Sequence, residues 1–231
     1  MDPHVTVLVL PSGAVDVAGL PLDSPRGGLD DTWDAVKRNA ARLRMPVRVS
    51  VAQPDGLVEA HAVAPDGTAV IVDRHPLKRP TDPVDPQWMD GMPDRHELLA
   101  LVRAADRAAQ WRGARVAAER LAAQVRNELG DRHPHTVLAV ELQGHFALRA
   151  RDWVGAARLY TWAAGARYLL GAPASDTRTA MDNAVSCWTR SRRYDGAFTA
   201  GLDLAHVLVR AAPEPRGRLA AVLKGLDGAA R

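Results

Sequence analysis

The sequence predicts an amino-terminal α+β domain with the element order ββαβββ, followed by an all-α domain of helical hairpins with a final capping helix. Two observations support this prediction. Up to about residue 73, apolar residues alternate with polar ones or form short runs, as in strands; from about residue 94 they recur at spacings of three and four, as in helices. A corner of similar sequence also recurs three times in the second part. We therefore expect domains at residues 1–75 and 94–231, joined by a linker at residues 76–93.

The amino-terminal domain is expected to contain five strands and one helix. The helix begins near Leu29, and the carboxylates of Asp30 and Asp31 in its first turn interact favourably with the helix dipole. Pro-Asp-Gly segments precede each of the last two strands, and they predict turns because proline fixes one backbone angle and glycine accepts positive φ. A β-grasp-like module is one candidate, but no residue pattern selects it. The strands are predicted at residues 5–10, 14–20, 47–51, 57–63 and 69–72.

The linker is recognised by its prolines, which stand at positions 76, 80, 83, 86 and 93 and prevent a continuous helix. Trp88 and Met89 are apolar residues within it that we expect to anchor it on the first helical hairpin. Residues 94–97 resemble a capping box that opens the helical domain. At the other end, Pro213 and Pro215 end the last hairpin. A final helix is expected to cover the exposed end of the stack, as terminal repeats require, through Leu219, Val222, Leu223 and Leu226.

The helical domain is organised around the repeated corner. Its copies are residues 111–114, 153–156 and 194–197; each starts with an aromatic residue and ends with alanine. The intervals between the copies are 42 and 41 residues. Each corner lies between two stretches of helical pattern. Periods of this size are typical of stacked helical hairpins.

In these residues the chain resembles the tetratricopeptide repeat family, over about residues 94–226. Residues 129–136 resemble the exits of the longer repeats found in kinesin light chains and many bacterial regulators. The chain departs from the family pattern because Val102 and Val185 stand where the family has glycine, and no copy ends with the usual proline. The resemblance rests on Gly144, Ala156, Tyr160 and Ala163 in the second copy, on Ala184, Trp188, Tyr194 and Ala197 in the third, and more faintly on Leu98, Leu101, Ala105, Trp111, Ala114 and Leu121 in the first.

The resemblance implies that the first helix of each hairpin lines a concave groove. An arginine stands four residues before each corner aromatic, and Asn183 is of a residue type that binds peptide backbone in related repeats. Planar guanidinium groups suit carboxylates, so the expected partner is another protein with an acidic or carboxyl-terminal segment. No residue pattern indicates an oligomeric state. The predicted partner-binding residues are Arg103, Arg107, His145, Arg149, Asn183, Ser186 and Arg190.

No catalytic, cofactor-binding or metal site is expected. His96-Glu97 begins like a zinc-peptidase helix, but Ala100 occupies the position of the second histidine. Cys187 is the single cysteine, and its position in a helical pattern favours a packed thiol over a nucleophile. His133 and His135 are expected to be loop residues. These observations predict a protein without enzymatic activity.

Charge and composition set further limits. The net charge of +3 argues against a general polyanion-binding protein, and the bias to arginine and alanine is typical of GC-rich bacterial genomes. No apolar segment is long enough to cross a membrane, so we expect a soluble cytoplasmic protein. An adaptor that binds a partner peptide or helix is the first hypothesis. A bacterial sensor of a small peptide or metabolite is the second. A nucleic-acid or enzyme-accessory role, with a phosphate patch at Arg190, Arg192 and Arg193, is the third.

Overall fold

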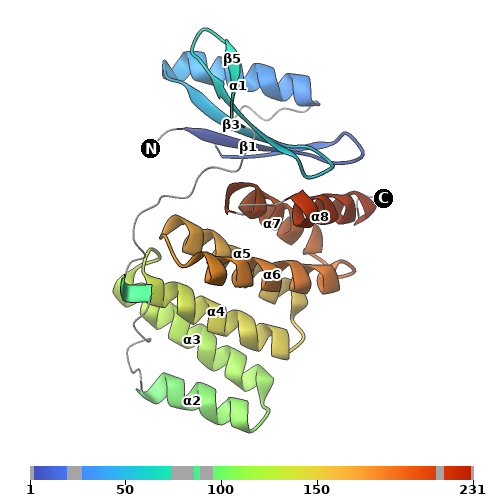
Figure 1. Ribbon diagram of the computed structural model, residues 1–231. Helices are drawn as coiled ribbons and strands as arrows, with labels where there is room; N and C mark the ends of the chain where they lie inside the picture. Colours follow the sequence, from blue (N-terminus) through green and yellow to red (C-terminus); the bar gives the residue numbers. More distant parts are fainter. Residues whose placement is uncertain (1–2, 20–27, 74–85, 89–95, 212–215, 230–231) are drawn as a thin grey trace. The chain divides into compact units, whose positions relative to one another are not determined.

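The computed structural model describes residues 3–19, 28–73, 86–88, 96–211 and 216–229 (Figure 1). The chain divides into two compact units, one formed by residues 1–78 with 205–231 and the other by residues 79–204. This division differs from the predicted one at the carboxyl end, because the residues after Leu204 group with the sheet.

The amino-terminal unit contains a five-stranded mixed sheet, and the element order along the chain is the predicted ββαβββ. The strand order is β2-β1-β3-β4-β5; β1 and β3 are parallel and the other neighbours are antiparallel. A parallel pair needs a crossover connection, which α1 provides between β2 and β3. The elements are β1 (His4–Val9), β2 (Val15–Gly19), α1 (Leu29–Leu43), β3 (Val47–Ala52), β4 (Val58–Val63) and β5 (Ala69–Asp73).

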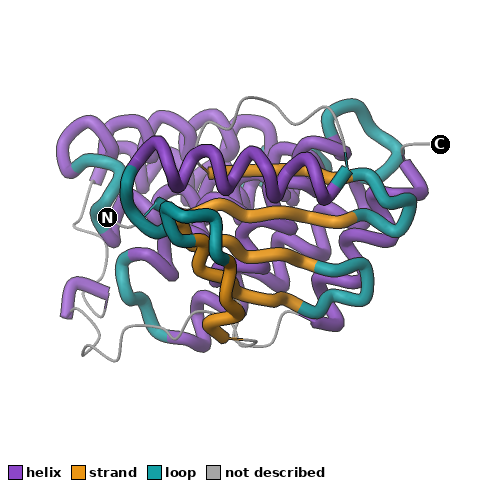
Figure 2. The backbone as a smooth tube through the Cα atoms, turned by 90° about the horizontal axis from the view of Figure 1, so that it is seen from above, coloured by secondary structure: helices purple, strands orange, loops and turns teal. Residues whose placement is uncertain are grey.

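Both faces of the central strands are buried. Helix α1 lies along one face of the sheet, as Figure 2 shows, and Val36 of this helix packs with Val7 and Val51 of the strands. Successive side chains of a strand point to opposite faces, so Thr6 and Leu8 lie on the face away from α1. Both are buried as well. The central strands β1 and β3 are therefore covered on both faces, whereas the edge strand β5 is exposed.

The carboxyl-terminal residues contribute to the amino-terminal unit. The backbone N–H of Ser12 donates to the carboxylate of Asp227 at 3.0 Å, and the Arg216 guanidinium donates to Asp55 at 2.9 Å. His206 Nε2 lies 2.7 Å from the Asp16 carboxylate. Asp227 and Arg216 belong to α8 (Arg216–Ala229). The helix was predicted to cover the helical stack through its apolar stripe, whereas its polar contacts at Asp227 and Arg216 are with turns of the sheet. The members of the stripe, each 0% exposed, are Leu219, Val222, Leu223 and Leu226.

The helical unit is built from antiparallel helices that pack in chain order (Figure 1). Helix α2 packs on α3, α3 on α4, α4 on α5, and α5 on α6. The first and second hairpins are α2/α3 and α4/α5, and the third, α6/α7, is named from its place in the sequence, since α7 extends past Leu204, where the helical unit ends. Their helices are α2 (His96–Arg107), α3 (Trp111–Leu129), α4 (Pro134–Arg149), α5 (Trp153–Leu169), α6 (Ala174–Ser191) and α7 (Ala197–Ala211).

The first two corners share one backbone geometry. Ala109 and Arg151, each two residues before the corner tryptophan, both have positive φ, 53° and 63°. Gln110 and Asp152 follow them, and each donates its backbone N–H to the carbonyl five residues earlier at 2.9 Å. The corner tryptophan is the first residue of the next helix in both cases. Tyr194 differs, because it precedes α7 by three residues and is 45% exposed.

The described part of the linker contacts the helical unit through Trp88 in particular. Pro86–Trp88 form a short 3₁₀ helix, and the buried Trp88 indole packs with Val137, Ala163 and Ala172. Its ring N–H donates to the Leu170 carbonyl at 3.3 Å. Trp88 therefore packs on the second hairpin and the turn after it, and not on the first hairpin as predicted. Met89 and the other linker prolines lie outside the described residues.

Candidate functional site

The seven predicted binding residues lie on α2, α4 and α6, the first helices of the three hairpins. Within each helix they are three, four or seven residues apart, which places them on one helical face. Asn183 is half-buried and the other six are exposed. They are Arg103 and Arg107 on α2, His145 and Arg149 on α4, and Asn183, Ser186 and Arg190 on α6.

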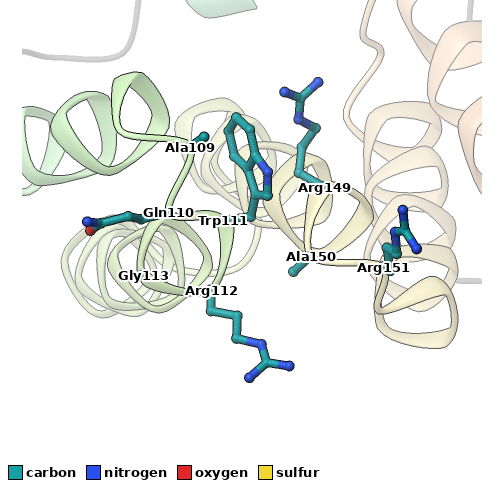
Figure 3. Close-up of a pocket in the computed structure, with 8 residues that line it drawn as sticks. All are labelled: Ala109, Gln110, Trp111, Arg112, Gly113, Arg149, Ala150 and Arg151. Carbon is teal, nitrogen blue, oxygen red and sulfur yellow. The ribbon is translucent and has the colours of Figure 1, made fainter.

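Two of the predicted arginines stack on corner tryptophans. The Arg149 guanidinium lies 4.1 Å from the centre of the Trp111 ring, and Figure 3 shows the two side chains next to each other. Arg190 lies over Trp153 in the same way, at 5.5 Å. In both pairs the arginine belongs to the hairpin that follows the tryptophan. Each guanidinium therefore stacks with one face on the preceding hairpin and links successive hairpins. The sequence did not predict this role.

The other predicted residues make fewer contacts. Arg190 donates a hydrogen bond to the Ser186 hydroxyl at 2.5 Å, which fixes both side chains on α6. The His145 ring contacts Phe146 edge-on, with 5.0 Å between ring centroids. Arg107 precedes the first corner, so no earlier corner aromatic exists for it to stack on. Arg149 of α4 and Arg190 of α6 are therefore held by stacking contacts that the arginines of α2 do not have with a corner aromatic.

A pocket of about 280 Å³ lies beside Asn183, between α4, α5 and α6. At its base is Arg167, which is only 6% exposed. Its guanidinium donates two hydrogen bonds to the Glu141 carboxylate, at 2.5 and 2.7 Å, and a longer one to Asp176 at 3.5 Å. The same guanidinium lies over the Trp88 ring at 4.9 Å. The pocket is lined by Glu141, Tyr160, Arg167, Asp176, Thr179, Ala180 and Asn183.

Burial raises the pKa values of two groups in and near this pocket. Burial raises the pKa of Tyr160 to about 12, with smaller contributions from Cys187 and Glu141. Burial also raises the pKa of the Cys187 thiol to about 11, although the nearby Arg190 opposes the shift. The thiol is buried and protonated at neutral pH, so it lacks the thiolate character of a nucleophile. The charges of the pocket are therefore those of two carboxylates and one arginine.

A second, shallower pocket of about 420 Å³ lies between the first two corners (Figure 3). Three arginines line it, Arg112, Arg149 and Arg151, and no carboxylate does. At the second corner, the Asp152 carboxylate accepts the Gly155 N–H at 2.9 Å and pairs with an arginine of α3. Gln110 occupies the equivalent position at the first corner. The first corner therefore lacks the carboxylate that the second corner has at this position.

None of the described helices combines the length and the apolar composition that a membrane crossing requires. Within the described residues, no three His, Cys, Asp or Glu side chains are grouped to hold a metal ion. Comparison with known proteins gave no match to a protein-family model, to a curated protein sequence or to a solved structure.

Proposed function

We propose that the helical unit is a tetratricopeptide-like repeat stack and that the protein is a non-catalytic adaptor, binding an extended segment of another protein along α4 and α6. The repeat assignment is supported by the shared geometry of the first two corners and by the arginine–tryptophan contact at each. A contact that recurs at equivalent positions is the expectation for hairpins that stack in one register.

The pocket beside Asn183 is the observation that carries the binding proposal. It opens onto a polar stripe of α6 whose members are three or four residues apart and so share one face. The stripe is about 21 Å long at 1.5 Å per residue, room for about six residues of extended chain. Asn183 lies near its middle, where a side-chain amide can both donate to and accept from a peptide backbone. The stripe consists of Asp176, Thr179, Asn183, Ser186 and Arg190.

The two ends of this surface carry opposite charge. Glu141 and Asp176 lie at the pocket, while Arg149 and Arg190 lie at the carboxyl ends of α4 and α6. A guanidinium that is already stacked on an indole has fewer orientations to lose when it binds a carboxylate. We therefore assign the arginine end to an acidic residue or to the carboxyl terminus of the partner segment.

The polar lining of the pocket favours a peptide over a metabolite. Pockets for small-molecule ligands typically have volumes of about 300–1,000 Å³ and are mostly apolar. The pocket beside Asn183, at about 280 Å³, lies near the lower end of this range but is lined largely by polar and charged side chains. Such a pocket holds one side chain of a longer ligand, so the sensor hypothesis is the less favoured alternative.

The proposal is tested by selecting peptides from a displayed random library on the full-length protein. Selected peptides are expected to bind Asn183→Ala about tenfold more weakly than wild type, because one hydrogen-bonded amide is lost. Arg178→Ala is the matched control, since Arg178 is exposed on α6 but lies off the stripe. Absence of any enriched peptide, or equal binding to wild type and Asn183→Ala, would contradict the proposal.

A further inference from the structure

Positive charge is concentrated at the turns that join the two helices of each hairpin. Seven arginines, named here the basic edge, lie in these turns or at the helix ends beside them, and all seven are exposed. None forms an ion pair with another described residue. The same segments contain three aspartates, Asp106, Asp152 and Asp195. The seven arginines therefore leave an excess of four positive charges, which is larger than the net charge of +3 of the whole chain. The seven are Arg107, Arg112, Arg149, Arg151, Arg190, Arg192 and Arg193.

The pocket between the first two corners is the best-formed part of the basic edge. In Figure 3, Arg149 extends upward beside Trp111, Arg151 lies to the right and Arg112 extends downward. The stack on Trp111 holds Arg149 in place. Guanidinium groups bind phosphate oxygens bidentately. The pocket lining carries three positive charges and no carboxylate, whereas a single carboxylate ligand would supply only one negative charge. This composition suits phosphate groups.

The character of the basic edge favours nucleic acid over an acidic protein. Protein partners gain most of their affinity from apolar or aromatic anchors that enter pockets. Here Trp111 packs against the core residues Ala114 and Ala118, and its ring is covered by Arg149, so it is not available as an anchor. Charge spread over three successive turns matches the repeated phosphates of a single strand. The ring of Tyr194 is 45% exposed and has the Arg193 guanidinium over it at 5.4 Å, so this ring, like that of Trp111, is stacked on an arginine of the basic edge.

We infer that the basic edge binds the phosphate backbone of single-stranded nucleic acid, with little preference for sequence. This inference goes beyond the proposed function. Arg107, Arg149 and Arg190 are shared with the predicted groove, whereas Arg112, Arg151, Arg192 and Arg193 lie outside it, so the two proposals can be tested separately at these four. The net charge of +3 hides the site, since the surplus is confined to one edge of the helical unit.

The test is fluorescence anisotropy of the full-length protein with a labelled oligouridylate of about 20 nucleotides, over a series of salt concentrations. Binding is expected to weaken steeply with salt. The double variant Arg112→Gln/Arg151→Gln is expected to lower the slope of log K against log salt by about 1.4, or about 0.7 for each phosphate contact. Arg120→Gln/Arg178→Gln is the control; it removes the same charge from exposed positions of α3 and α6 and is expected to retain the wild-type slope.

Three results would overturn the inference. The first is no binding at low salt. The second is an equal loss of slope in both double variants, which would indicate diffuse attraction to the whole surface. The third is competition by polyglutamate of equal length as strong as that by unlabelled oligouridylate, which would assign the basic edge to an acidic protein. Melting curves of both double variants that match wild type establish that the fold is intact. Unchanged oligouridylate binding by Asn183→Ala supports a site separate from the groove.

Discussion

Replacement of Arg167 by methionine tests whether the charge cluster beside Asn183 holds the helical unit together. Methionine retains an unbranched apolar stem next to Trp88 but removes the guanidinium that joins Glu141 and Asp176. Removing one partner of a fully buried ion pair costs about 3–5 kcal/mol, since the other charge stays buried without a counter-ion. The carboxylate side chains here are 20% and 48% exposed, so water compensates in part. We expect a loss of about 2–3 kcal/mol in the free energy of unfolding.

The double variant Arg167→Met/Glu141→Leu separates the charge effect from the packing effect. Replacing both partners by apolar residues removes the unpaired charge, so most of the lost stability is expected to return, to within about 1 kcal/mol of wild type. Urea unfolding followed by tryptophan fluorescence measures the free energies. Arg178→Met is the control and is expected to change stability by less than about 0.5 kcal/mol, because Arg178 is exposed. If Arg167→Met behaves like Arg178→Met, or if the double variant is no better than the single one, the reasoning is refuted.

Three further predictions concern other contacts. Gly56→Ala and Gly67→Ala both place alanine at positive φ, 81° and 84°, but only the methyl at Gly56 would overlap the backbone of α8. Gly67→Ala is expected to cost about 1–2 kcal/mol and Gly56→Ala at least about 1 kcal/mol more; equal melting temperatures would mean that α8 does not pack there. The pKa of His4 is lowered to about 4, chiefly by burial and also by two nearby arginines, from 6.5. Because the unfolded chain binds the proton first, stability falls as pH drops from 6.5 to 4, by about 2 kcal/mol after allowance for partial exposure. His4→Gln is expected to flatten this part of the stability–pH profile, and an unchanged profile would exclude His4 as its source. A double-mutant cycle of Arg149→Ala and Trp111→Ala is expected to give a coupling of about 0.5–1 kcal/mol, and zero coupling would show that the stack contributes no stability.

The amino-terminal elements could be predicted because their signals are local. Alternating valines mark β3, and the Pro-Asp-Gly segments fix the turns before β4 and β5. The place of α8 could not be predicted in the same way. Its leucine stripe shows that the helix is covered on one side, but an apolar stripe does not specify which surface covers it. Contacts such as Asp227 with Ser12 join residues 215 positions apart, and no local pattern records them.

The candidate site was predictable in position but not in its contacts. The register of the corners located Arg149 and Arg190 on the first helices of their hairpins. Their stacking on tryptophans depends on how one hairpin packs on the next. The nearly equal separations of the stacked pairs, 38 residues between Trp111 and Arg149 and 37 between Trp153 and Arg190, could have indicated a repeated contact. Arg167 was missed because a helical arginine is usually solvated. Its burial depends on Glu141, 26 residues away on another helix.

An NMR titration of the isotope-labelled full-length protein with a library-selected peptide tests most directly whether α4 and α6 form the binding surface. The account predicts that the largest backbone amide shifts fall on Thr179, Asn183 and Ser186 and on the facing residues of α4. Amides on the other side of α6, such as those of Arg178 and Thr189, are expected to change little. Shifts concentrated on that other side, or in the sheet, would contradict the account.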